Sequence, residues 1–333
     1  MCFHDESWPV RDEACLACGR FCRAYPDECL SNLPLLKERW LEQLTDQIWS
    51  VREDAAVALG YALLAYPSQL KPVLLEFIRT KLPDAREQPA MTLEEYKKHV
   101  NDIQAHTEQQ LYSCGSLAPK LRKGGAGRIG CMSCGITRPK ALWERTDGCL
   151  YLIREIINVC CEENNIELEL DDETLLPLME EVADVCRVKH FPQSDELRTT
   201  LFRQLPDIAR KLGKQRFKRT YLQLFLDLIM NTIDSRTASA LSKHAAGQCA
   251  EELGQLVGAS IFRGRLDEYQ QEVYDRVMEE RRQLPPGPKS DGLSPFGPPE
   301  LLTTARYPGL PPSDTNLGTN GTTTQGMHPG IKK

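Results

Sequence analysis

Apolar residues recur at helical spacing along most of this chain. In one stretch they fall every four positions, at Val51, Ala55, Leu59 and Leu63. This spacing predicts a helix with one apolar stripe. Ser50 is expected to cap that helix, and Glu53, three residues later, would complete a capping box. Pro67 lies just beyond the pattern, where a helix commonly ends.

The same periodicity predicts a largely helical chain. Trp143 begins one further helical stretch, WERTDGCLYLIREIINV. Other helices are expected at residues 33–44, 69–82, 92–111, 173–188, 194–212, 215–233, 236–257 and 261–284. We therefore expect an all-α fold.

Two segments of the chain repeat one another. Residues 4–26 match residues 45–67 without a gap, and matched positions lie 41 residues apart, as Trp49 does from Trp8. The matched pairs are Asp5 with Asp46, Trp8 with Trp49, Arg11 with Arg52, Ala14 with Ala55, and Gly19 with Gly60. A period near 40 residues is typical of stacked helical hairpins. The second helix of one hairpin would start near Ser50, after a first helix at residues 33–44.

The shared pattern D-x-x-W-x-V-R-x-x-A-x-x-x-x-G resembles the HEAT-repeat family, an armadillo-type helical solenoid. The resemblance implies an α-α superhelix of stacked hairpins. It also implies that turn aspartates and second-helix arginines form a hydrogen-bonded ladder between repeats. The residues in those positions are Asp5, Arg11, Asp46 and Arg52. In the stretch at Trp143, Lys140 replaces the aspartate and Thr146 the arginine, so we expect this hairpin to pack without the ladder.

The chain divides by composition into four parts. They are HEAT repeats at 1–111, a basic insertion loop with Gly and Cys at 112–141, degenerate hairpins at 142–284, and a tail at 285–333. The tail is rich in Pro, Gly, Ser and Thr and is expected to be disordered. The first repeat lacks its first helix, which favours a chain cut from a longer parent.

Charge and cysteine content limit the function classes. A net charge of −6 argues against a general nucleic-acid binder. No stretch reads as a signal peptide or is long enough to span a membrane. The 13 cysteines are an odd number, and many occupy apolar helix positions. We interpret them as reduced thiols in a cytoplasmic or nuclear protein.

Two groups of cysteines resemble metal sites. Cys15, Cys18 and Cys22 share one helix face and are interpreted as core residues. Cys131 and Cys134 form a C-x-x-C in the insertion loop, with Cys114 upstream. A zinc site would need a second such pair nearby. We expect no metal and no cofactor, and keep a metal- or thiol-dependent protein using Cys114, Cys131 and Cys134 as the alternative.

No catalytic motif accompanies the six histidines, so we do not expect an enzyme. A basic cluster at a helix junction is the candidate binding site; it comprises Arg210, Lys211, Lys214, Arg216, Lys218 and Arg219. The alternative is a solvated helix end. The expected function is a scaffold or adaptor that binds a protein partner of unknown identity through a concave surface. Tubulin is a narrower candidate, because tryptophans lie near the turns.

Overall fold

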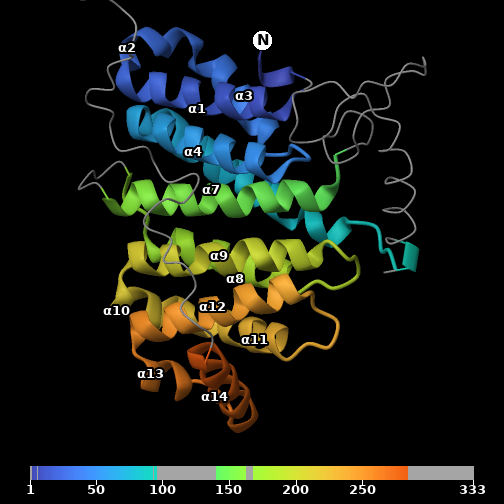
Figure 1. The fold of residues 1–333 in the computed structure, drawn as a ribbon. Coiled ribbons are helices and arrows are strands. Elements are labelled where there is room, and N and C mark those ends of the chain that lie inside the picture. The colour runs from blue at the N-terminus through green and yellow to red at the C-terminus, as the bar shows by residue number, and fades with distance from the viewer. Residues whose placement is uncertain (1, 6, 93, 96–139, 163–167, 284–333) are drawn as a thin grey trace, which may run out of the picture. The chain divides into compact units, whose positions relative to one another are not determined.

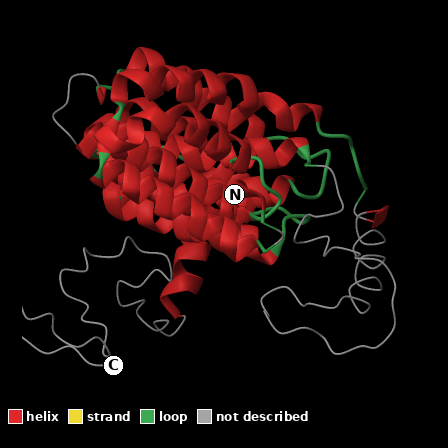
Figure 2. Ribbon diagram, turned by 90° about the horizontal axis from the view of Figure 1, so that it is seen from above, coloured by secondary structure: helices red, strands yellow, loops and turns green. Residues whose placement is uncertain are grey.

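The computed structural model describes residues 2–5, 7–92, 94–95, 140–162 and 168–283, and these ranges contain helices and loops but no strand (Figure 2). The predicted all-α fold is confirmed for them. The α-helices are α1 (Trp8–Ala24), α2 (Pro26–Cys29), α3 (Leu33–Gln43), α4 (Trp49–Ala65), α5 (Pro67–Lys81), α7 (Leu142–Glu162), α8 (Asp172–Cys186), α9 (Ser194–Leu212), α10 (Lys214–Arg216), α11 (Leu222–Ile233), α12 (Ala240–Val257), α13 (Ala259–Arg263) and α14 (Glu268–Gln283). The 3-10 helices are η1 (Cys2–His4), η2 (Leu30–Asn32) and η3 (Leu82–Glu87), and η5 (Phe217–Tyr221) is a π-helix.

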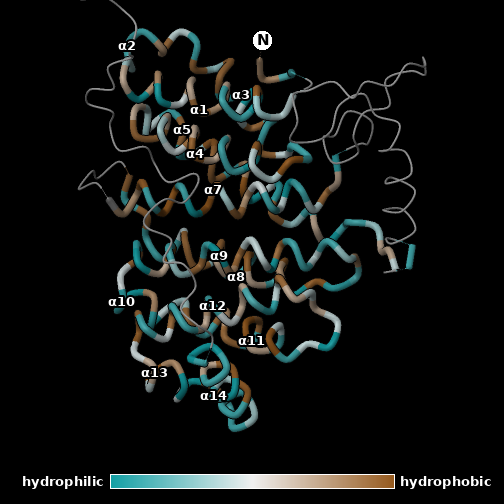
Figure 3. The backbone as a smooth tube through the Cα atoms, viewed as in Figure 1, coloured by the Kyte–Doolittle hydropathy of each residue, from teal (hydrophilic) through white to brown (hydrophobic). Residues whose placement is uncertain are grey.

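Helices α1, α4, α7, α9 and α12 pack in that order, each against the next (Figure 1). We call these five the helix row. The other long helices pack against its members: α3 and α5 contact α4, α8 contacts α9, and α11 contacts α12. Helix α11 is hydrophobic along most of its length (Figure 3), and its Phe225, Leu226 and Ile229 are fully buried. Helices far apart in sequence therefore share one core.

Helix α4 is buried on several sides, in agreement with the small residues that its sequence carries beside the apolar stripe. The apolar stripe of Val51, Ala55, Leu59 and Leu63 is fully buried, as expected. Ala56, Ala58 and Ala62 are fully buried too. Because α4 has a neighbour in the helix row on each side, small side chains are needed around most of its circumference.

Two glycines allow helices to approach closely. A Cβ atom at Gly19 of α1 would lie 2.7 Å from the Cα of Ala58 in α4. A Cβ atom at Gly148 of α7 would lie 1.8 Å from the carbonyl oxygen of Leu44. Both distances are shorter than van der Waals contact, so a larger residue at either position would push backbone segments apart.

Side-chain caps and glycines define several helix ends. The Asp171 carboxylate accepts a hydrogen bond from the Thr174 N–H at 2.8 Å at the start of α8, and the Ser239 hydroxyl accepts one from the Ser242 N–H at 3.2 Å at the start of α12. Gly213 and Gly258 follow α9 and α12 with φ of 82° and 106°. Only glycine adopts such φ values without strain, so these two residues favour the ends of α9 and α12.

Some predicted boundaries are wrong. Helix α4 begins at Trp49, so Ser50 lies inside it, and its hydroxyl donates to Asp12 Oδ2 at 2.9 Å instead of capping. Glu53 pairs with Arg154 rather than with the helix end. The single helix expected at 261–284 is two helices, α13 and α14. Most of the predicted helix at 92–111, nearly all of the insertion at 112–141 and the whole tail at 285–333 lie outside the described residues.

Within the described ranges, no helix combines the length and apolar character needed to cross a membrane.

Candidate protein-binding surface

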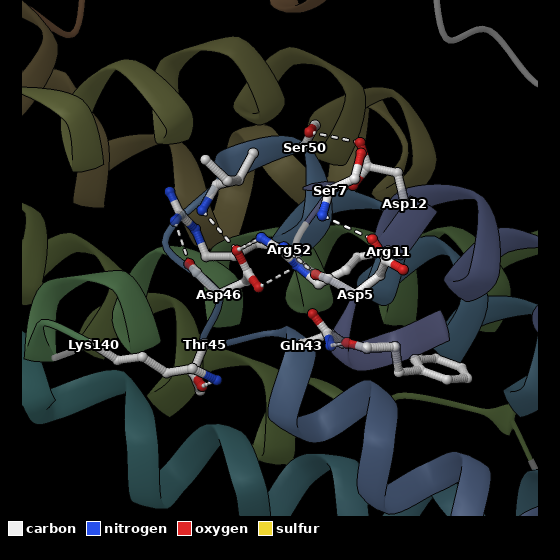
Figure 4. A network of polar contacts seen from close by, with 12 residues as sticks. Asp5, Ser7, Arg11, Asp12, Gln43, Thr45, Asp46, Ser50, Arg52 and Lys140 are labelled. Carbon is white, nitrogen blue, oxygen red and sulfur yellow. Dashed lines mark hydrogen bonds and ion pairs between the residues drawn. The ribbon is translucent and has the colours of Figure 1, made fainter. Parts of the chain in front are cut away.

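The first rung of an arginine–aspartate ladder joins α1 to the turn before α4 (Figure 4). Arg11 is buried, and its Nε and Nη2 donate to the two carboxylate oxygens of Asp46, each at 3.1 Å. Its Nη1 donates to the carbonyl oxygen of Asp5 at 2.9 Å. Asp5 thus contributes its backbone, while its carboxylate accepts from the Ser7 N–H at 2.8 Å. The planar guanidinium therefore donates to acceptors on both sides of the contact between α1 and the turn before α4.

The second rung joins α4 to α7. Arg52 Nε donates to Asp147 Oδ2 at 2.8 Å, and Arg52 Nη2 lies 2.7 Å from the same oxygen. Its Nη1 donates to the Asp46 carbonyl at 2.7 Å, as Arg11 does to Asp5. The side chains of Arg52 and Asp147 are both at least 98% buried. The Arg52 guanidinium also lies 5.4 Å from the centre of the Trp143 ring.

This second rung corrects the expectation that the hairpin at Trp143 packs without a ladder. The carboxylate comes from Asp147, inside α7, rather than from the turn position that Lys140 occupies. Lys140 donates to the Glu42 carbonyl and the Thr45 hydroxyl, each at 3.1 Å. Aligning the segment at Trp143 with the earlier segments compares only equivalent positions. It could not show that Asp147, which lies inside α7 rather than in the turn, reaches Arg52.

A pair of carboxylates at the α1–α4 contact was missed by the sequence analysis. Asp12 is buried, and its Oδ1 has no hydrogen-bond partner among the described residues. Burial raises the pKa of Asp12 to about 6. Burial, together with the negative charge of Asp12, raises the pKa of Asp54 to about 7. Helical spacing alone could not show that these acids, on different helices, lie close enough for their charges to interact.

The helix-face cysteines lie where the sequence predicted. Cys15 and Cys22 are fully buried, and Cys18 is partly buried. Burial raises the pKa of the Cys22 thiol to about 12, which suits a core residue better than a nucleophile. No group in the described ranges has the arrangement of three His, Cys, Asp or Glu side chains that a metal ion needs. Cys114, Cys131 and Cys134 lie outside those ranges, so the metal or thiol alternative stays a prediction.

The six residues of the basic cluster do not form one uniform surface. Arg210 pairs with Asp207 on α9 and with Glu252 on α12. Arg216 donates to Asp172 Oδ1 at 2.8 Å and to the Leu170 carbonyl at 2.7 Å. Lys211, Lys214 and Arg219 are exposed, and Lys218 is partly exposed. Two of the arginines are therefore neutralised by neighbouring acids.

One side of the helix row carries polar side chains, some exposed and some partly buried. On α9 these recur at helical spacing, as at Arg203, Asp207 and Arg210. Ion pairs connect this side across neighbouring helices: Glu53 with Arg154 at 2.8 Å, and Arg210 with Glu252. We call it the outward face; it comprises Glu53, Arg154, Asn158, Arg203, Asp207, Arg210, Glu252 and Gln255.

No protein-family model matches the chain, and no curated protein or solved structure matches it.

Proposed function

We propose that the protein is a non-catalytic scaffold of HEAT-like hairpins, and that it binds a protein partner through the outward face of the helix row. In this proposal the outward face is the concave side of an α-α superhelix. The observation that carries it is the order of contacts: five helices pack one against the next, and four of them, α4, α7, α9 and α12, contribute to one polar side. Such rows present extended surfaces to partners.

The ladder supports this proposal by fixing the helices that bear the face. Arg11 and Arg52 each bond the carbonyl of one repeat and the carboxylate of the next. A guanidinium held on both sides resists sliding of one helix along its neighbour. Side chains on α4 and α7 are then presented at a constant spacing, and a partner needs little energy to organise them.

The composition of the outward face also supports protein binding. It mixes arginines, acids and amides rather than carrying one sign of charge. Mixed polar surfaces with arginine are common at non-obligate protein interfaces, whereas a nucleic-acid surface is strongly basic.

Affinity capture with matched variants tests this proposal. The full chain would be the bait, and the test variant would carry Arg203→Glu and Gln255→Glu on the outward face. The control would carry Arg79→Glu and Gln69→Glu, the same chemical changes at exposed positions of α5. We expect specific partners, identified by mass spectrometry, to be lost from the test variant and kept by the control. Equal recovery by both variants, with unchanged melting temperatures, would contradict the proposed surface.

A further inference from the structure

The segment from Lys214 to Tyr221 has two distinct sides. On one side, Arg216 and the Tyr221 hydroxyl both donate to Asp172 Oδ1 at the start of α8. The Phe217 ring is fully buried against the core. These contacts attach the segment to the rest of the molecule.

A π-helical turn produces this arrangement. The Leu222 N–H donates to the Phe217 carbonyl, five residues back instead of four. The wider turn brings residues five apart closer to one face than an α-helix would. Arg216 and Tyr221, five apart, can therefore share one carboxylate. Lys214 and Arg219 are exposed and Lys218 is partly exposed, whereas the Phe217 and Tyr221 side chains are buried.

Lys214, Lys218 and Arg219 form no hydrogen bond or ion pair with any residue that the structure describes, whereas Arg210 and Arg216 do. Like charges close together repel one another and gain from an external anionic group. The uncompensated positive charge of the basic cluster thus includes these three side chains.

We propose that Lys214, Lys218 and Arg219 form a docking site for an acidic peptide segment of a protein partner. This inference rests on the proposed scaffold function and names the chemistry of one contact. The aromatic rings of the segment, Phe217 and Tyr221, are fully buried, so it offers no platform on which bases could stack. The lack of such a platform favours an acidic peptide over a single-stranded nucleic acid.

The direct test measures binding of a fluorescent polyglutamate peptide to the full chain by anisotropy. The test variant carries Lys214→Glu, Lys218→Glu and Arg219→Glu. The control carries Lys189→Glu, Arg236→Glu and Arg265→Glu, which are exposed at separate places and change the net charge equally. Three exposed charge contacts together predict an affinity loss of about tenfold in the test variant. The control should lose less than about twofold, and added salt should weaken native binding.

Three results would overturn the proposal: no peptide binding by the native chain, equal losses in both variants, or tighter binding of single-stranded oligothymidylate than of polyglutamate. Melting temperatures would verify that both variants fold. The same two variants should then be used in the affinity capture described above. If the test variant keeps all the partners that the Arg203 and Gln255 variant loses, the docking site is wrong while the scaffold function stands.

Discussion

The two ends of the helix row achieve similar packing by different means. At the α1 end, a buried arginine of one helix bonds an aspartate of a later segment, as Arg11 of α1 does with Asp46 and Arg52 of α4 with Asp147 of α7. At α9, Arg198 stays close to its own helix, pairing with Asp195 and donating to the Val188 carbonyl at 2.9 Å. Towards α12, the Asp195 carboxylate accepts a hydrogen bond from the Ser239 N–H at 2.7 Å.

Apolar packing takes the place of the ladder at the second end. Leu205 of α9 and Leu253 of α12 are fully buried, as is much of α11. Packing of this kind is not directional and tolerates many sequences. The difference shows that the ladder is not required for helices to stack in a row.

Removing Arg52 should have the largest effect on stability. Arg52→Ala leaves Asp147 buried without its charge partner, and we expect a loss of about 3–5 kcal/mol in the free energy of unfolding. Urea denaturation would measure it. Arg282→Ala is the control, because its pair with Glu279 is exposed and should contribute less than about 1 kcal/mol. Similar values for both variants would show that the buried rung contributes no more than a surface ion pair.

The next largest loss of stability should come from filling the close contact at Gly148. The added Cβ of Gly148→Ala would overlap the Leu44 carbonyl oxygen, so overpacking should cost about 1–3 kcal/mol. At the other end of the row, a Cβ at Gly247 would lie 3.5 Å from Val277 Cγ1, an ordinary contact. Gly247→Ala should therefore be neutral or slightly stabilising. If the thermal denaturation curves of Gly148→Ala and Gly247→Ala shift equally, then close approach of the backbone is no more important at the α1 end of the row than at the α12 end.

Arg198→Ala should cost less than Arg52→Ala. Asp195 would keep its bond from Ser239 N–H, so the loss is that of a few hydrogen bonds, about 1–2 kcal/mol. Urea denaturation of both variants under one set of conditions compares them directly. An Arg198 variant as unstable as the Arg52 variant would mean that the two ends depend equally on buried arginine.

The pH dependence comes last, because Asp54 is partly exposed and solvent screening should reduce the effect of its raised pKa on stability. The pKa of Asp54 is raised from 3.8 to about 7, so the folded state binds protons more tightly than the unfolded state. The stabilisation from this group is fully present below its unfolded pKa and is lost as the pH rises through about 7. Asp54→Asn should make the melting temperature depend less on pH between the unfolded and folded pKa values of Asp54, and should raise the melting temperature near pH 8. An unchanged pH profile would show that Asp54 does not titrate in this range.

Sequence reasoning succeeded where structure follows local pattern or an exact repeat. The helix at 194–212 was predicted with its observed bounds, and Arg11 was assigned to the boundary where it meets Asp46. It failed where the hydrogen-bond partner of an arginine lies at a position that the repeat pattern does not indicate. Asp147 reaches Arg52 from inside a helix, and Arg216 reaches Asp172 through a π-helical turn that no residue pattern marks.

A double-mutant cycle between Arg52 and Asp147 tests most directly whether the ladder holds the N-terminal end of the row together. The single variants Arg52→Met and Asp147→Leu and their combination would be compared by urea denaturation. We predict a coupling energy of about 2 kcal/mol or more, because each single change leaves a buried charge alone while the double change removes both. A coupling below about 0.5 kcal/mol, with additive losses, would contradict it.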